Sequence, residues 1–173
     1  LIGAGSTVFT PGLLVDLARS SVLSDTTVRL VDIDPAAVEV MTALGRRLAS
    51  ELGSTLEVTG TTDRRSALAG ADFVTTTIAV GGASGWETDM RIPEEFGIHQ
   101  TVGDTVGPGG FLRALRHIPE LVAIATDIAD LAPTAWLVNY SNPLTANVRA
   151  ITSQTPVRTI GLCHGTMHSA GAI

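Results

Sequence analysis

The chain has 173 residues, a formal net charge of −6, and a composition that is 45% hydrophobic and 16% charged, which is typical of a packed globular domain and excludes a disordered segment. Its basic residues are all Arg and are scattered, so no nucleic-acid partner is expected. The lack of Lys excludes a Schiff-base lysine and a P-loop. A single Cys excludes an internal disulfide and favours a cytoplasmic location, and no apolar run approaches the ~20 residues of a membrane span.

A Gly-x-Gly turn, Gly3-Ala4-Gly5, follows two apolar residues and precedes a helix signal. In nucleotide-binding α/β domains such a turn lets backbone N–H groups approach a diphosphate, because glycine has no Cβ. Val8 replaces the third glycine of the usual G-x-G-x-x-G motif, so a purely structural turn is the alternative. Thr10 as N-cap and Pro11 at the first helical position predict a helix to about residue 20. The expected cofactor contacts here are Gly3, Gly5, Ser6, Thr7, Val8 and Phe9.

A β-branched strand predicted over residues 26–31 ends at Asp32. An acidic side chain at the tip of the second strand of such a fold accepts hydrogen bonds from both hydroxyls of an adenine-linked ribose. A carboxylate there repels a 2′-phosphate, so the expected cofactor is NAD and not NADP. The alternative is that Asp34-Pro35 only caps the next helix. We assign ribose binding to Asp32 and the cap to Asp34.

Helix and strand signals continue to alternate after Asp34. This order predicts a parallel sheet with right-handed crossovers, a doubly wound, Rossmann-like α/β fold. The predicted elements are a helix over residues 35–52, a strand over 56–59, a short helix over 63–68 and a strand over 71–80. Residues 81–110 are expected to be irregular apart from a short helix near 92–96. Their glycine-rich end, residues 99–110, indicates a backbone folded against a ligand, with a surface loop as the alternative.

A long helix is predicted over residues 111–131, with a kink at Pro119. A strand over 135–139 follows it. Pro143 then either begins a helix to about residue 153 or lies in a cis bond that holds Asn142. The last predicted strand, residues 157–162, ends just before Cys163. The apolar face of the long helix is expected to contain Leu112, Leu115, Ile118, Val122 and Ala125.

The carboxyl ends of parallel strands share one edge of a sheet, and we expect the polar residues that follow them to face one crevice. A lone Cys is often a buried small hydrophobe, but Cys163 next to His164 beyond a strand end is equally consistent with a thiolate metal ligand. A nucleophilic role is less favoured, because no Asp or Asn is identifiable that would orient a Cys–His pair. The groups expected at this edge are residues 3–7, Asp32, Gly81, Gly82, Asn142, Cys163 and His164.

Five motifs occur in order along the chain: Gly3-Ala-Gly-Ser6, Val31-Asp-Ile-Asp34, Gln100-Thr-Val-Gly-Asp-Thr-Val-Gly-Pro-Gly-Gly110, Asn139-Tyr-Ser-Asn-Pro143 and Gly161-Leu-Cys-His164. With these motifs the sequence resembles the NAD- and divalent-metal-dependent glycosidases of glycoside hydrolase family four. The resemblance covers the whole chain. It implies a fold related to lactate and malate dehydrogenases and a departure from the two-carboxylate scheme of most glycosidases.

In that family NAD⁺ takes a hydride from sugar C3, a base removes the C2 proton, the aglycone leaves C1, water adds and the hydride returns. A divalent metal, commonly Mn²⁺, polarises the C2 and C3 oxygens. The resemblance implies that Cys163 is the metal ligand and that Asn142 holds the sugar hydroxyls. Asp104 corresponds to an acidic substrate contact with a catalytic role, and His164 to the acid that assists departure of the aglycone. It further implies substrate contact by Gln100 and cofactor contact by Val80 and Asn139.

The resemblance also implies that residues 1–173 form a Rossmann-like NAD-binding domain truncated at both ends, whose C-terminal substrate domain is missing, and that the protein is a homo-oligomer. The open alternatives are a 2-hydroxy-acid dehydrogenase of the lactate/malate type and a non-catalytic NAD-binding module.

No Lys or Arg lies between Arg65 and Arg91, so we expect a non-phosphorylated α-hexoside or a hexuronide as the small-molecule substrate. Arg91, Arg113 and Arg116 are candidates to pair with a uronate carboxylate, with a solvated or structural role as the alternative.

Overall fold

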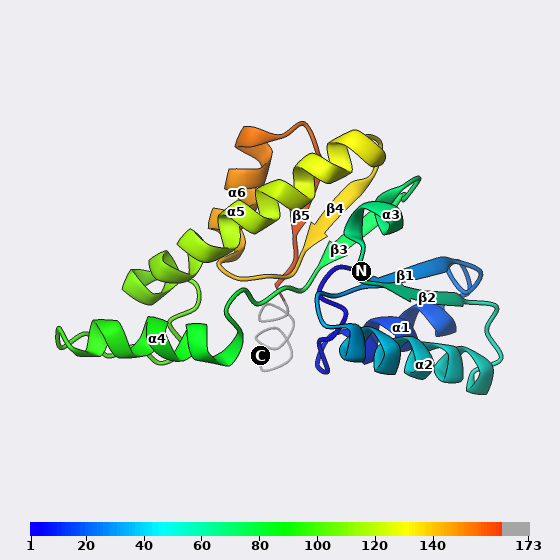
Figure 1. The fold of residues 1–173 in the computed structure, drawn as a ribbon, viewed down its shortest axis with the longest axis horizontal. Helices are drawn as coiled ribbons and strands as arrows, with labels where there is room; N and C mark the ends of the chain where they lie inside the picture. Colours follow the sequence, from blue (N-terminus) through cyan, green and yellow to red (C-terminus); the bar gives the residue numbers. More distant parts are fainter. Residues whose placement is uncertain (164–173) are drawn as a thin grey trace, which may run out of the picture. The chain divides into compact units, whose positions relative to one another are not determined.

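The computed structural model describes residues 1–163, which form an α/β fold with parallel strands (Figure 1). Most predicted strands and helices are confirmed to within one or two residues at each end. The elements are α1 (Thr10–Arg19), β1 (Thr27–Val31), α2 (Pro35–Glu51), β2 (Glu57–Thr61), α3 (Arg64–Leu68), β3 (Phe73–Thr76), α4 (Gly82–Glu94), α5 (Gly107–Leu131), β4 (Trp136–Asn139), α6 (Leu144–Gln154) and β5 (Arg158–Gly161).

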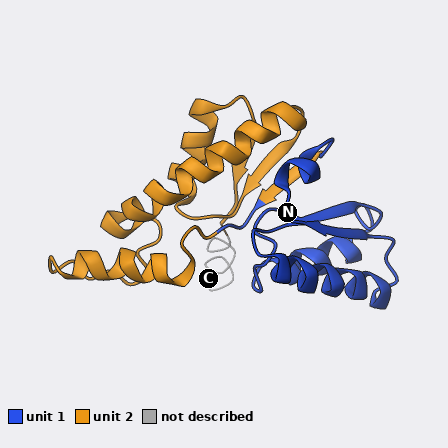
Figure 2. Cartoon of the chain, viewed as in Figure 1, with its two compact units in different colours: residues 1–71, 76–78 blue, residues 72–75, 79–173 orange. Residues whose placement is uncertain are grey.

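The chain divides into two compact units, residues 1–71 with 76–78 and residues 72–75 with 79–173 (Figure 2). In the first unit β1 pairs in parallel with β2, and α1 and α2 pack against each other. Ile2 makes parallel bridges with Val31 and Thr76, so the residue before the Gly-x-Gly turn is bonded as the end of a strand, as predicted. Leu14, Leu30, Met41 and Val58 belong to the apolar core of this unit.

The second unit is built on a three-stranded sheet in the order β3-β4-β5. α5 packs against both α4 and α6, and α6 also contacts β5. Leu121 and Ile128 on α5, Leu137 on β4 and Ile151 on α6 are fully buried. Each such side chain contributes about 1.5–3 kcal/mol by leaving water, so α5 is the central helix of this unit.

The structure corrects the prediction for residues 81–110, where α4 is a 13-residue helix in place of an irregular segment. Gly82, Gly85 and Pro93 lower the intrinsic helix propensity of this stretch. Long-range contacts outweigh that propensity: the indole N–H of Trp86 donates to the Val102 carbonyl (2.7 Å), and the side chain of Asp89 pairs with α5.

Three boundaries or faces near α5 also differ from prediction. α5 begins at Gly107 instead of residue 111. Its buried stripe contains Ala114 and His117, whereas Leu115, expected on the apolar face, is 57% exposed. β3 ends at Thr76 instead of residue 80, and at Val80 side chains of α5 bond the backbone N–H and C=O.

Asp side chains cap α2 and α3, whereas the N-cap predicted for α1 does not form. Asp34 accepts from the N–H of Ala36 at the start of α2, as predicted, and Asp63 caps α3 in the same way. Thr10 is not an N-cap: it is the first residue of α1, and its buried hydroxyl donates to the Ala4 carbonyl (2.8 Å). Both expectations for Pro143 hold, since the Asn142–Pro143 bond is cis and α6 begins at the next residue.

No helix within residues 1–163 has both the length and the apolar character needed to span a membrane.

Candidate functional site

The Gly-x-Gly turn of the first unit needs glycine at both positions. Gly3 has φ of +88°, and a Cβ there would lie 2.8 Å from the backbone carbon of Thr77. A Cβ on Gly5 would lie 2.9 Å from a carboxylate oxygen of Asp32. The hydroxyl of Thr77 donates to the Gly3 carbonyl (2.9 Å), so the turn is held by the segment that follows β3. The backbone therefore passes through a space that no side chain can share.

Replacing Gly3 by Ala is expected to lower the free energy of unfolding by about 1–3 kcal/mol, because the left-handed backbone and the close Thr77 backbone both oppose a Cβ. Urea denaturation followed by circular dichroism measures this change. The matched control is Gly12→Ala in α1, where a Cβ would meet nothing within 4 Å. That variant should gain about 0.5–1 kcal/mol through helix propensity. Equal effects of the two substitutions would contradict the steric account.

The residues between the turn and α1 present backbone donors. Ser6 ends the turn locally, since its hydroxyl accepts from the N–H of Phe9 (3.1 Å) and its carbonyl from the N–H of Thr10 (3.1 Å). The exposed residues Thr7 and Val8 have N–H groups with no partner within residues 1–163. Donors of this kind at a helix start suit a phosphate oxygen, so these residues fit a dinucleotide diphosphate.

Asp32 is held where β1 ends. One carboxylate oxygen accepts from the N–H of Gly5 (2.7 Å) and the other from the N–H of Asp34 (3.1 Å). Each oxygen of an ionised carboxylate has a further lone pair. The carboxylate therefore has the acceptor capacity that a pair of ribose hydroxyls requires, and it is fixed against the turn.

In the second unit, the structure brings together two residues that the sequence assigns to substrate. The side-chain amide of Asn142 donates to one carboxylate oxygen of Asp104 (2.8 Å), and the hydroxyl of Thr105 donates to the other (2.8 Å). The guanidinium of Arg113 on α5 donates through Nε to the Asn142 carbonyl (3.3 Å). Asn142 and Asp104 are 38 residues apart in sequence, so tertiary structure creates the pair.

Gln100 holds the loop between α4 and α5. Its side-chain oxygen accepts from the N–H of Gly109 (3.0 Å), and its side-chain nitrogen donates to the Asp89 carbonyl (3.3 Å). Cβ atoms added at Gly103 or Gly109 would collide with neighbouring atoms. The glycine-rich run is thus closely packed, and Gln100 supports the loop that contains Asp104.

Asn139, a predicted cofactor contact, is fully buried. Its side-chain oxygen accepts from the N–H of Ser141 (3.2 Å), and its side-chain nitrogen donates to the Ser141 carbonyl (2.9 Å). The buried amide of Asn147 on α6 donates to that same carbonyl (3.0 Å). These bonds shape the turn that leads to Asn142.

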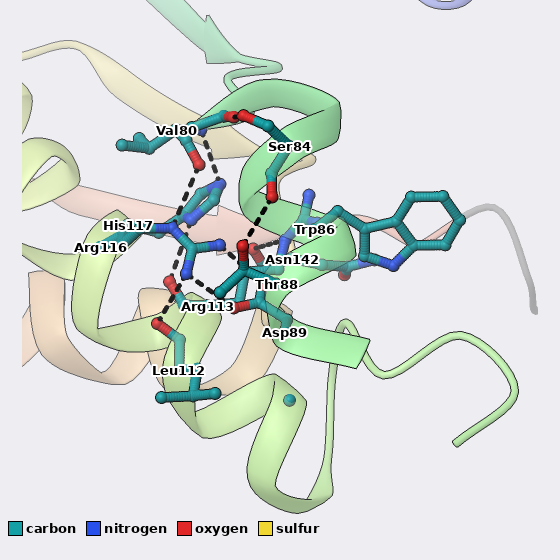
Figure 3. Close-up of polar contacts among 12 residues, drawn as sticks. Val80, Ser84, Trp86, Thr88, Asp89, Leu112, Arg113, Arg116, His117 and Asn142 are labelled. Carbon is teal, nitrogen blue, oxygen red and sulfur yellow. Dashed lines mark hydrogen bonds and ion pairs between the residues drawn. The ribbon is translucent and has the colours of Figure 1, made fainter. Parts of the chain in front are cut away.

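The backbone of Val80, the other predicted cofactor contact of the second unit, is hydrogen-bonded to side chains of α5 (Figure 3). Its N–H donates to Nε2 of His117 (3.2 Å), and its carbonyl accepts from Nε of Arg116 (3.4 Å). Because Nε2 of the buried His117 is an acceptor, Nδ1 bears the proton and donates to the Arg113 carbonyl (3.0 Å). His117 is therefore a neutral imidazole that connects the end of the strand to α5.

Arg116 forms a two-pronged ion pair with Asp89 of α4, with both N–O distances at 2.6 Å (Figure 3). The Asp89 side chain is 0% exposed and that of Arg116 is 30% exposed. The hydrogen bonds that Arg116 donates to Asp89 raise the pKa of the Arg116 guanidinium above its ordinary value. The pair joins α4 to α5 and orients the side chain that bonds Val80.

Asp89 and His117 are not predicted from the sequence as parts of this site, whereas Arg116, a candidate for a uronate carboxylate, takes the structural role that was its alternative. Asp89 lies in a segment read as irregular. The available signal for His117 is its helical spacing from Ala114, Leu121 and Ile128, since a His within an apolar stripe must find buried partners. No local pattern marks Arg116 as the partner of Asp89.

Cys163 is exposed and lies two residues beyond the end of β5, close to the strand end as predicted. The N–H of the preceding residue, Leu162, donates to the Asn139 carbonyl (3.0 Å). His164 lies outside the described residues. Within residues 1–163 there is no group of three His, Cys, Asp or Glu side chains that could hold a metal ion. These residues therefore offer one candidate metal ligand and not a complete metal centre.

Parallel strands joined by helices, a tight Gly-x-Gly turn and a carboxylate bonded to that turn define a Rossmann-like, doubly wound α/β protein. Comparison with known families makes this specific. The model of the family described as Family 4 glycosyl hydrolase matches residues 1–172. The chain therefore belongs to this family.

Individual relatives agree with that membership. The chain is 39% identical over 166 residues to an α-glucosidase from Erwinia rhapontici, covering 95% of this chain and 37% of that protein. It is 42% identical over 167 residues to an α-galacturonidase from Thermoanaerobacterium saccharolyticum, covering 94% and 36%. A solved 6-phospho-α-glucosidase from gut microorganisms, in complex with NAD and Mn²⁺, has a TM-score of 0.80 and 30% identity over 94% of this chain and 37% of its own.

Lactate and malate dehydrogenases share the fold alone. The lactate dehydrogenase from Cryptosporidium parvum has a TM-score of 0.60 at 19% identity over 90% of this chain and 40% of its own. A malate dehydrogenase from Salinibacter ruber has a TM-score of 0.64 at 16% identity over 94% and 43%. The predicted fold relationship is confirmed, and the likeness carries no argument for dehydrogenase activity.

Proposed function

We propose that this chain supplies the dinucleotide-binding turn and the sugar-binding residues of an NAD- and divalent-metal-dependent glycosidase. The hydrogen bond from Asn142 to Asp104 carries the proposal (2.8 Å). These are the two residues that the family resemblance assigns to the sugar, and they are neighbours in a chain whose residues 1–172 match the family. The chain spans little more than a third of the curated relatives' length, and a further substrate domain beyond this one is part of the proposal.

The residues of the first unit fit NAD. Thr7 and Val8 offer exposed N–H groups for the diphosphate, and Asp32 offers acceptor oxygens for the ribose. When bound, the nicotinamide would accept a hydride from sugar C3 and return it after the glycosidic bond has broken. Ser6 and Thr77 hold the turn in shape through the bonds described above. We propose Val80 and Asn139 as further cofactor contacts, on the support of the family resemblance.

Asn142 and Asp104 bind and orient the sugar in this proposal. The side-chain amide of Asn142 donates one N–H to Asp104, so its second N–H and its oxygen can bond neighbouring sugar hydroxyls. Asp104 retains lone pairs beyond the bonds from Asn142 and Thr105, and its negative charge strengthens a hydrogen bond from a sugar hydroxyl. Gln100 supports the Asp104 loop and is proposed as a weaker substrate contact.

Cys163 fits a divalent metal as one thiolate ligand, and the remaining ligands are not among residues 1–163. A bound metal would stabilise negative charge on the sugar oxygens. We propose His164 as the acid that assists departure of the aglycone. A cytoplasmic location and a homo-oligomeric state complete the proposal; a single Cys in 173 residues supports the first.

The decisive experiment is hydrolysis of nitrophenyl α-galactoside, α-glucoside and α-galacturonide by the intact protein, with and without NAD⁺ and Mn²⁺. We expect nitrophenol release from at least one substrate only when both cofactors are present, with no net formation of NADH. Release without NAD⁺ would overturn the mechanism. NAD binding without any turnover would favour the non-catalytic module, and NADH formation from lactate or malate would favour the dehydrogenase.

Asp32→Asn should change the choice of dinucleotide. The substitution keeps an acceptor for Gly5 but removes the charge that repels a 2′-phosphate, so the ratio of NAD to NADP affinity should fall by about 10- to 100-fold. Fluorescence titration with each dinucleotide measures the ratio. Asp34→Asn is the matched control, because Asn replaces Asp well at an N-cap. An unchanged ratio in Asp32→Asn would remove Asp32 from ribose binding.

A further inference from the structure

The three arginines that are candidates to bind a substrate carboxylate differ in whether their guanidinium groups are already paired with a carboxylate of the protein. Arg116 is held by the Asp89 carboxylate, the Val80 carbonyl and the Leu112 carbonyl. Arg91 pairs with Glu95 on the exposed side of α4. Arg113 is half-buried, and its side chain makes one hydrogen bond, from Nε to the Asn142 carbonyl (3.3 Å). Within residues 1–163, no carboxylate pairs with Arg113.

Arg113 lies beside the residues that hold the sugar in the proposed function. The carbonyl that its Nε contacts belongs to Asn142, whose side chain bonds Asp104 (Figure 3 shows Arg113 and Asn142 together). Because Nε anchors one part of the planar guanidinium, the group is oriented while both terminal nitrogens keep their N–H donors. Two parallel N–H donors of this kind match the two oxygens of a carboxylate.

We propose that Arg113 is the residue that recognises the C6 carboxylate of a hexuronide substrate. This inference rests on the proposed function and narrows it. One guanidinium balances the single charge of a planar carboxylate, whereas a phosphate dianion next to the negative charge of Asp104 needs more cations. Arg116 and Arg91 cannot supply them without breaking their own pairs. Relatives include both α-glucosidases and α-galacturonidases, so the family alone does not choose between these substrates.

The test compares kcat/KM of the intact holoenzyme on nitrophenyl α-galacturonide, α-galactoside and 6-phospho-α-galactoside, before and after Arg113→Met. We expect the wild-type protein to prefer the galacturonide. The variant should lose about 10- to 100-fold on the galacturonide, mainly through KM, and change little on the neutral galactoside. Arg91→Met is the matched control and should leave the ratio unchanged. Arg113→Lys, which keeps the charge but loses the two-pronged geometry, should fall between Met and wild type on the galacturonide.

Equal losses on charged and neutral substrates would overturn the inference, because Arg113 would then only support the Asn142 backbone. A wild-type preference for the neutral or the phosphorylated sugar would overturn it as well, while leaving the proposed glycosidase intact. Absence of turnover on all three substrates would instead contradict the proposed function. As a readout that needs no turnover, galacturonate should protect the wild-type protein against thermal unfolding more than galactose does. Arg113→Met should abolish that difference.

Discussion

Arg116→Met is expected to lower the free energy of unfolding by about 3–5 kcal/mol, because it leaves the fully buried carboxylate of Asp89 without its partner. Met retains much of the volume of the Arg side chain, so the loss measures the charge and its hydrogen bonds more than a cavity. Arg116 also bonds the Val80 carbonyl, and release of that bond should weaken NAD binding. Urea denaturation of the intact protein measures the first effect, and NAD titration measures the second.

The double variant Arg116→Met, Asp89→Leu separates an unpaired charge from a general loss of packing. Replacing both partners with apolar groups should recover most of the stability lost in the single variant. Arg47→Met is the control, since Arg47 pairs with Glu51 on the exposed surface of α2 and its replacement should leave the free energy of unfolding nearly unchanged. If Arg116→Met costs no more than Arg47→Met, the Asp89 pair does not hold α4 to α5.

Cys163→Ser is expected to lower metal-dependent turnover by at least about 100-fold, since changes even to groups that only support a metal ligand cost 10–100-fold. The serine hydroxyl is nearly isosteric but does not ionise at neutral pH, so it is a poor metal ligand. Cys163 is exposed, so the substitution should leave folding stability within about 0.5 kcal/mol of the wild type. Turnover of the preferred nitrophenyl glycoside at saturating NAD⁺ and increasing Mn²⁺ measures the loss.

Binding measurements make the Cys163 result specific. Mn²⁺ affinity, followed by electron paramagnetic resonance of the free ion, should fall in the variant, while NAD affinity should stay unchanged. Unaltered Mn²⁺ affinity together with unaltered turnover would remove Cys163 from the mechanism. Loss of NAD affinity would show that the substitution disturbs the fold and not the metal.

Much of the architecture follows from local chemistry that the sequence displays. The helix over residues 35–51 is signalled by the Asp34 cap and Pro35, and β1 by its β-branched run up to the carboxylate of Asp32. The left-handed backbone at Gly3 is also readable, since only glycine adopts it without strain. The sequence also nominates Asn142 and Asp104 individually as substrate contacts, from motifs that resemble those of a known family.

Three features of the structure depend on tertiary contacts that helix propensity and hydrophobic periodicity do not predict. Helix α4 forms over a stretch with two glycines and an internal proline because Asp89 bonds Arg116, 27 residues away in sequence. The buried face of α5 is set by His117, whose Nε2 accepts from Val80, 37 residues away. Tertiary structure likewise determines which arginine can bind a substrate anion, because Arg116 and Arg91 pair with carboxylates and Arg113 does not within residues 1–163. Long-range pairs such as these form only once the chain is folded, because a buried charge or imidazole takes whichever partner the packed elements bring within hydrogen-bond distance.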